Sequence, residues 1–196
     1  MFDRLFTSLH KRWFGLVERL SLEPRRIASP DRAILEEVIL PYFGQGVDFQ
    51  RILFVGCSAY TQWYDTFFPD KEYWTIDSQT RKRKYGARQH IVGSITELGR
   101  HFPPVFFQAI IMNGVIGFGL DTVEEIERAL EACFETLDHG GILVVGWNDH
   151  AQRTPIKLDA LHALQHFAPY RFEPLQTNQL RTAGWQRHTF SFYRKA

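Results

Sequence analysis

The sequence has few cysteines, a balanced charge and no long apolar run, and each absence excludes a class of protein. Cys57 and Cys133 are its only cysteines. They fall in different predicted elements, so we expect no disulfide framework and a reducing compartment. The net charge of +1 gives no strong field to attract nucleic acid. No apolar run is long enough to span a bilayer, and charges interrupt the apolar residues near Met1, unlike a signal peptide. These features predict a cytoplasmic protein without a nucleic-acid partner.

Several ligand motifs are missing as well. The segment after the first predicted strand is not G-x-G-x-x-G, the pattern of nicotinamide dehydrogenases. The chain has no Gly-Lys-Ser/Thr phosphate loop, and no cysteine–histidine spacing that indicates zinc. The sequence therefore predicts no metal site.

Apolar residues make up 44% of the chain and aromatic residues 15%, enough for one domain with a substantial core. Strand-like and helix-like segments alternate five times, which predicts a parallel sheet with helices on both faces. The predicted strands of this part are Ile52–Val55, Glu72–Ile76, Gln89–Val92, Phe106–Met112 and Ile142–Trp147.

The chain is organised around Arg51–Phe68. An apolar strand ends at Gly56, small residues follow, and Thr61–Phe68 can form a helix. A glycine turn lets the backbone approach a ligand, and a helix N-terminus offers unpaired N–H groups to ligand oxygens. This is the arrangement of a nucleotide-binding unit in an open α/β sheet.

Asp77 ends the second predicted strand, 21 residues after Gly56 (77 − 56). Dinucleotide-binding folds place an acid at about this interval, roughly 20 residues, to accept hydrogen bonds from ribose hydroxyls. The alternative is an N-cap for the helix predicted over Thr80–Arg88. The basic residues of that helix are expected to form a solvated face.

The predicted helices have clear start and stop signals. Ser29 and Pro30 begin one helix, which Pro41 is expected to end. Thr122 and Glu125 form a capping-box pattern for a helix over Asp121–Asp138. The pair Gly140–Gly141 is expected to end it.

The last part of the chain is expected to change pattern. We predict a helix over Leu158–Phe167, a strand over Arg171–Leu175, and a final antiparallel strand over Gln186–Arg194. At the other end, Phe2–Leu20 has apolar residues at helical spacing. We expect residues 1–28 to form a helix and connector that cover the main domain as a lid. A contact with a membrane surface or lipid substrate is the alternative.

Taken together, these segments resemble the class I S-adenosylmethionine-dependent methyltransferases over roughly Ser29 to the C-terminus. The passages that carry the resemblance are VGCSAYT at 55–61, TIDSQ at 75–79, GSITEL at 93–98, LDHGGILVVGWND at 137–149 and RHTFSFYRK at 187–195. The resemblance implies a three-layer Rossmann-like fold with a mostly parallel seven-stranded sheet, an antiparallel last strand and helices on both faces. It also divides the chain into residues 1–28 and a methyltransferase-like domain, 29–196.

The resemblance further implies S-adenosylmethionine as cofactor. The positions that match the cofactor site of the family are Gly56, Cys57, Ser58, Tyr60, Asp77, Ser78, Ser94, Ile95, Asn113 and Gly114. Ser58 and Tyr60 stand where the family loop usually has further glycines, and Ser94 stands where an acid is usual. Tyr60 is expected either to stack on the cofactor or to crowd it.

We therefore hypothesise a methyltransferase that acts on a small molecule, with Asn113, Asp149 and His150 as candidate catalytic residues. His150 has the pKa range of a general base near neutral pH, although a loop histidine without a catalytic role is equally compatible with the sequence. The chain lacks the Asn-Pro-Pro-aromatic passage of amino-methylating nucleic-acid enzymes. The alternative hypothesis is a catalytically inactive protein that keeps the fold for binding. A nucleophilic role for Cys57 is a weaker hypothesis than a packing role, because the sequence shows no base partner for it.

Overall fold

The computed structural model describes residues 26–150 and 156–196. The described part of the chain contains an eight-stranded sheet with the order β3-β2-β1-β4-β5-β8-β6, in which β7 also pairs with β8. The strands are β1 (Arg51–Val55), β2 (Glu72–Asp77), β3 (Gln89–Val92), β4 (Phe107–Asn113), β5 (Leu137–Asn148), β6 (Phe167–Pro169), β7 (Gln179–Arg181) and β8 (His188–Lys195). The first five pair in parallel, and β8 is antiparallel to β5. The predicted fold class is thereby confirmed.

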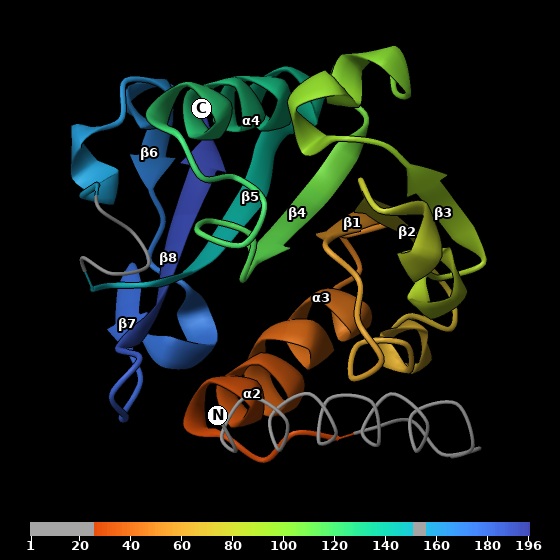
Figure 1. Ribbon diagram of the computed structural model, residues 1–196, viewed down its shortest axis with the longest axis horizontal. Coiled ribbons are helices and arrows are strands. Elements are labelled where there is room, and N and C mark those ends of the chain that lie inside the picture. The colour runs from red at the N-terminus through yellow and green to blue at the C-terminus, as the bar shows by residue number, and fades with distance from the viewer. Residues whose placement is uncertain (1–25, 151–155) are drawn as a thin grey trace, which may run out of the picture.

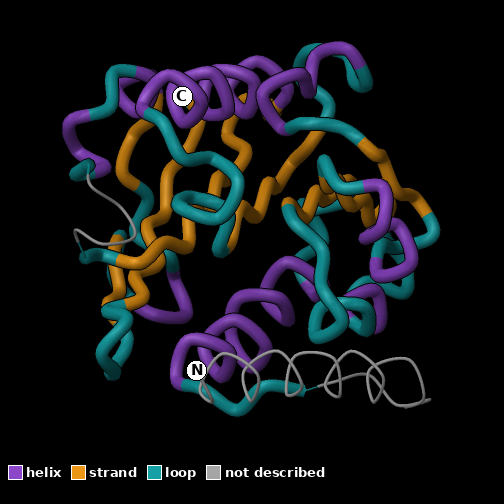
Figure 2. Tube along the Cα trace, viewed as in Figure 1, coloured by secondary structure: helices purple, strands orange, loops and turns teal. Residues whose placement is uncertain are grey.

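Helices cover the two faces of this sheet (Figure 1). One face packs against α4 (Val123–Thr136) and the short 3₁₀ helix η4 (Ile95–Arg100). The other face packs against the run α2 (Pro30–Ile34), η1 (Leu35–Ile39) and α3 (Leu40–Gln45). Figure 2 shows the strands between these two helical layers. The two cores lie on opposite sides of the sheet because successive side chains of a strand point to opposite faces.

The N-terminal helical run continues past Pro41, so the prediction that this proline ends the helix is wrong. Ser29 and Pro30 do begin it, with the proline at the first turn. A proline inside a helix clashes with the carbonyl four residues earlier and has no N–H to donate. Here the preceding turn, η1, is a π-helix, and Pro41 falls in the first turn of the α-helix that follows. The wider turn accommodates the proline without breaking the run.

The helices after β1 and β2 are shorter than predicted. Within the described residues, η2 (Tyr64–Phe67), η3 (Thr80–Tyr85) and η4 are 3₁₀ helices. Before η2, Thr61 donates a side-chain hydrogen bond to the Ser58 carbonyl, and within η2, Thr66 donates one to the Trp63 carbonyl. Such local bonds compete with α-helix formation. Buried Tyr64 and Phe68 then hold this segment against the sheet.

The helix α4 has the predicted capping box, in which Thr122 and Glu125 exchange hydrogen bonds. It ends at Thr136, and β5 begins at the next residue. The pair Gly140–Gly141 therefore lies within β5 rather than at the helix end. A bulge between Phe107 and Ala109 shifts the pairing of β4 with this part of β5.

The outer edge of the sheet is divided into two short strands. Both β6 and β7 pair antiparallel with β8, along different halves of it. The predicted helix over 158–167 consists of the 3₁₀ turns η5 (Leu158–Ala160) and η6 (Ala163–His166), and the predicted strand over 171–175 is mostly the turn η7 (Glu173–Leu175). The predicted helix is thus divided into two short 3₁₀ helices. The predicted strand is wrong in type, since short apolar runs do not distinguish helix from strand. The predicted final strand is confirmed.

The predicted helix Phe2–Leu20 lies outside the described residues. Among the residues that the structure describes, none of the helices combines the length and hydrophobicity needed to cross a membrane.

Lys195 is buried at the end of β8, where its ammonium group donates to the carbonyl oxygens of Phe134 (2.6 Å) and Leu137 (2.8 Å). These carbonyls belong to the C-terminal end of α4, where they have no partner within the helix. Replacing Lys195 by methionine keeps the apolar stem but removes both donors. We expect the free energy of unfolding to fall by about 1–3 kcal/mol, measured by urea denaturation. Arg194→Met, at a more exposed neighbour, is the control, and equal stability of the two variants would contradict this role.

Candidate functional site

The carboxyl ends of β1 to β5 meet at one edge of the sheet. The pairing of β1 with β2 aligns Val55 with Ile76, and that of β2 with β3 aligns Asp77 with Val92. The pairing of β4 with β5 aligns Asn113 with Gly146. Every residue predicted to bind a cofactor lines one cavity of about 280 Å³ at this edge. Ligands of open α/β sheets bind in this position.

The loop after β1 depends on the glycine at position 56. Gly56 has φ = 85°, a conformation that side chains disfavour. A Cβ at this position would lie 2.9 Å from Val115 Cγ1. The N–H of Gly56 donates to the Ile76 carbonyl at 2.8 Å. The backbone therefore turns away from the strand at the floor of the cavity.

The expected helix N-terminus is not present after this loop, because η2 starts only at Tyr64. Two loop N–H groups are used within the protein instead. Cys57 N–H donates to Asp77 Oδ2 (2.8 Å), and Ser58 N–H donates to Thr61 Oγ1 (2.9 Å). The prediction that a helix N-terminus offers its N–H groups here is wrong. Hydrogen bonds to the side chains of Asp77 and Thr61 hold the loop in position.

Asp77 is a buried carboxylate at the end of β2. Oδ2 also lies 3.3 Å from the ammonium of Lys82, and Oδ1 accepts from the Gln79 N–H at 2.9 Å. An ionised carboxylate has about four acceptor sites. The alternative that Asp77 is the N-cap of the next helix is wrong, because the N-cap of η3 is Gln79. Asp77 instead stabilises the turn before η3, and its Oδ1 retains capacity for a ligand hydroxyl.

Arg32, which was not predicted to be a site residue, also lines this cavity. It comes from α2 and lines the cavity with a side chain that is 12% exposed. Its Nη1 donates to the hydroxyl of Tyr64 at 2.9 Å, and its guanidinium lies 4.4 Å from the centre of the Tyr60 ring. Tyr60 is therefore held at the cavity wall by a cation–π contact.

The two residues at the start of η4 lie on the far side of the cavity. Ser94 caps this helix, since its Oγ accepts from the Thr96 N–H at 3.2 Å, and Ile95 is buried.

Cys57, in the loop after β1, is also buried. Burial, together with the charge of Asp77, raises the pKa of the Cys57 thiol to about 11. Cys57 is thus a protonated packing residue and is unsuited to act as a nucleophile.

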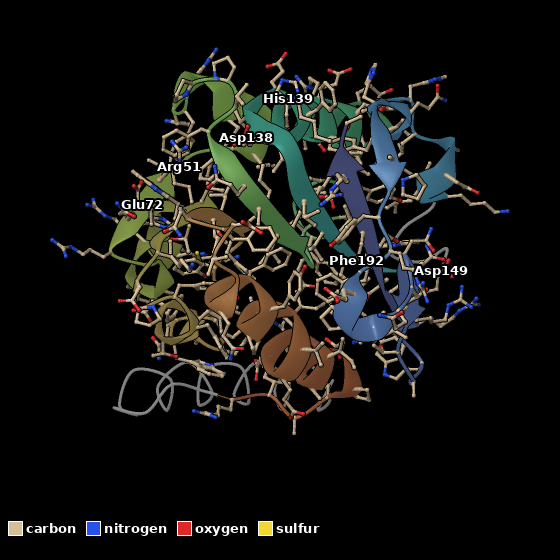
Figure 3. All side chains as sticks on the ribbon, turned by 180° about the vertical axis from the view of Figure 1, so that it is seen from behind. Arg51, Glu72, Asp138, His139, Asp149 and Phe192 are labelled. Atoms are coloured by element: carbon tan, nitrogen blue, oxygen red, sulfur yellow. The ribbon has the colours of Figure 1, made fainter. Side chains whose placement is uncertain are left out.

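Of the candidate catalytic residues, only Asn113 lines the cavity, while Asp149 and His150 do not. Asp149 forms ion pairs with Arg181 and Arg187 on the β7–β8 hairpin. Figure 3 shows Asp149 at the margin of the molecule, and its N–H donates to the Arg187 carbonyl just before β8. The ring centre of His150 lies 6.1 Å from that of Trp185. The structure therefore separates these two residues from the predicted cofactor residues.

Asn113 contacts a buried histidine, His188, that was not predicted to be a site residue. His188 Nε2 lies 3.0 Å from Asn113 Oδ1, and His188 Nδ1 lies 2.9 Å from Asn148 Oδ1. All three residues are buried. The alternation of β8 contained a signal, since His188 shares the parity of Phe190 and Phe192, which are core residues. A polar residue at the end of a buried face is expected to have a specific partner.

Burial is the main cause that lowers the pKa of His188 from 6.5 to about 4. The charge of Asp31 raises this pKa by a smaller amount, and the charge of Arg32 lowers it further. Below pH 6.5 the unfolded chain therefore takes up a proton that the folded ring rejects, so stability is lost as pH falls from 6.5 towards 4. We expect wild type to lose about 3 kcal/mol more over this range than His188→Gln. Urea denaturation at several pH values measures this loss of the free energy of unfolding, and His162→Gln is the control. Identical pH slopes for wild type and His188→Gln would contradict the assignment.

Comparison with solved structures identifies the fold. The N-methyltransferase NodS from Bradyrhizobium japonicum, in complex with S-adenosyl-L-homocysteine, matches with a TM-score of 0.66 at 15% identity, covering 90% of each chain. The 1,6-didemethyltoxoflavin-N1-methyltransferase from Burkholderia thailandensis matches with a TM-score of 0.52 at 12% identity, over 88% of this chain and 92% of that one. An rRNA methylase from Streptococcus thermophilus matches with a TM-score of 0.54 at 13% identity, over 87% and 99%.

The described residues thus have the fold of the class I S-adenosylmethionine-dependent methyltransferases. No protein-family model matches the sequence, and no curated protein matches it. Proteins of this fold that methylate different acceptors are similar to the chain to a comparable degree. The acceptor must therefore be inferred from the site itself.

Proposed function

We propose that the chain binds S-adenosylmethionine in the cavity at the strand ends and transfers its methyl group to a small-molecule acceptor. The observation that carries the proposal is the convergence of the loop after β1, Asp77 and Asn113 on one cavity. The fold is compatible with this role, and a structure of NodS contains the demethylated cofactor.

The residues of the cavity fit the chemical groups of this cofactor. Asp77 Oδ1 has free acceptor capacity for a ribose hydroxyl. Gly56 lines the cavity with backbone alone, so a cofactor could approach its main-chain atoms. When bound, S-adenosylmethionine supplies an electrophilic methyl group on a sulfonium.

The protein's contribution is to orient the two reactants and exclude water. Asn113 is placed for the first of these tasks, because it lines both this cavity and a neighbouring one. The acceptor's lone pair forms the new bond to carbon, the carbon–sulfur electrons return to sulfur, and any acceptor proton leaves to solvent. A small acceptor suits the chain better than nucleic acid, since the net charge is only +1.

A thermal-shift titration with S-adenosylhomocysteine tests the proposal. At about 100 times its dissociation constant, a ligand that binds only the folded state stabilises by roughly 2.7 kcal/mol. For a domain of this size the melting temperature should rise by about 5–10 °C. No shift at saturation would refute the proposal. It would favour the inactive binding protein, for which the Lys82–Asp77 ion pair at 3.3 Å is the supporting observation.

A further inference from the structure

A second cavity, of about 420 Å³, adjoins the first at the same edge of the sheet. Arg32, Tyr60, Asn113, Gly114 and Phe118 line both cavities. The second cavity extends over the ends of β5 and β8, and Asn148 and His188 also line it. A molecule in it would therefore lie beside the ligand of the first cavity, with Asn113 between them.

Asn113, His188 and Asn148 form a continuous polar row along three adjacent strands. Asn148 pairs with His188 across β5 and β8, and Asn113 pairs with Gly146 across β4 and β5. The missing side chain of Gly146 makes the row possible, because a Cβ there would lie 1.9 Å from Asn113 Oδ1 and 3.0 Å from His188 Nε2. The row is thus built into the sheet rather than formed by mobile surface groups.

The hydrogen-bonding capacity of the ring constrains both amides. Burial lowers the pKa of His188 to about 4, so at neutral pH the ring has one N–H donor and one acceptor nitrogen. One asparagine must then offer its oxygen to the ring and the other its NH₂ group. Rotation of an amide by 180° exchanges these two atoms, so either asparagine can take either role.

The outer ends of the two amides are consequently opposite in character. The asparagine that gives its oxygen to the ring turns its NH₂ group outward, and the other turns its oxygen outward. Within residues 26–150 and 156–196, no hydrogen bond to another protein group occupies these outer ends. The row therefore presents one donor and one acceptor to the second cavity.

The remaining lining of the second cavity includes three aromatic side chains and one pair of opposite charges. Tyr60, Phe118 and Trp185 provide flat surfaces, which suit a flat ring. The charged residues Asp31 and Arg32 lie 3.9 Å apart and pair with each other. An anionic or cationic ligand would have to compete with this pair.

We infer that the second cavity is the acceptor site, and that it selects a neutral heteroaromatic molecule with a hydrogen-bond donor and acceptor on one edge. This inference rests on the proposed function. In it His188 is a positioning residue, because it acts by fixing the opposite orientations of Asn113 and Asn148.

The binding test uses bicyclic lactams, which carry an N–H beside a carbonyl. The probes are 2-quinolone, isoquinolin-1-one and quinazolin-4-one, each compared with its N-methyl derivative, on protein saturated with S-adenosylhomocysteine. We expect at least one lactam to bind at least tenfold more tightly than its N-methyl derivative, because the derivative leaves a buried acceptor unpaired. Equal affinities within every pair, or preference for quinoline-2-carboxylate or phenethylamine, would overturn the inference.

Variants distinguish the row from the rest of the cavity. Asn148→Asp replaces the NH₂ group of the row by an acceptor oxygen, so the lactam carbonyl loses its donor and the lactams should bind at least tenfold more weakly. Gln186→Ala changes the same cavity outside the row and should bind the lactams like wild type. Unchanged lactam affinity in Asn148→Asp would overturn the assignment.

The ring state can be read without cofactor or acceptor. In ¹⁵N NMR spectra of the unliganded protein at pH 7, one ring nitrogen of His188 should show a pyrrole-type shift and the other a pyridine-type shift. A doubly protonated ring would overturn the inference, since both amides would then present NH₂ groups. Failure of S-adenosylhomocysteine to bind would overturn the proposed function, whereas binding without lactam discrimination would overturn only the acceptor assignment.

Discussion

Replacing Asp77 by alanine is expected to reduce sharply the thermal shift that S-adenosylhomocysteine produces in the wild-type protein. A hydrogen bond to a charged group contributes about 1.5–3 kcal/mol. Loss of the ribose hydrogen bond that Oδ1 can accept should therefore lower affinity by about ten- to a hundredfold. Titration calorimetry measures this loss directly. Unchanged affinity in Asp77→Ala would place the ribose elsewhere.

The structure indicates which controls this experiment needs. Asp77 also accepts from the Cys57 N–H and pairs with Lys82, so the alanine variant can alter the loop itself. Asp77→Asn keeps an oxygen for the loop but removes the charge, and it should lose affinity by a smaller factor. Asp70→Ala lies at the opposite end of β2 on the surface and should bind like wild type. The unliganded melting temperature of each variant reports on folding.

Replacing Gly146 by alanine should have the largest effect on stability. The new methyl group would overlap Asn113 Oδ1, at 1.9 Å, in the buried carboxyl-terminal part of β5. Overpacking of this kind costs about 1–3 kcal/mol, and breaking the Asn113–His188 bond leaves buried polar atoms unpaired for about 1–3 kcal/mol more. We expect the free energy of unfolding to fall by about 4 kcal/mol, measured by urea denaturation.

Gly99→Ala is the matched control for this variant. A Cβ at Gly99 would have its nearest contact 3.9 Å away, at Glu135 Oε2, so its stability should change by less than about 0.5 kcal/mol. If Gly146→Ala were as stable as Gly99→Ala, the row of Asn113, His188 and Asn148 could not be as tightly packed as described.

Much of the sheet was predictable because a buried strand has a recognisable local sequence pattern. The runs at Ile52–Val55 and Phe107–Met112 are continuous and apolar, as strands covered on both faces must be. The helices were less predictable. Pro41 normally ends a helix, and the π-helical turn that accommodates it has no sequence signal that we recognised.

The site divides in the same way. The loop at Gly56, Asp77 and Asn113 could be predicted because each directly follows an apolar strand, and the ends of parallel strands share one edge. Arg32 and His188 reach that edge from α2 and β8. The placement of Arg32 depends on packing between distant segments, so sequence spacing does not indicate it. For His188, the alternation of β8 indicates that the side chain faces the core, but it does not indicate which residues the ring contacts.

The π-helical turn η1 also sets the rotational phase of the N-terminal helix. An α-helix advances about 100° per residue, so a turn with one additional residue offsets everything before it relative to everything after. Phe43, beyond the turn, is anchored in the core, whereas Arg32, before it, faces the cavity. Removing one residue from η1 would rotate Arg32 by about 100° around the helix axis. A change inside the core would thereby take a guanidinium out of the site without altering any residue that lines it.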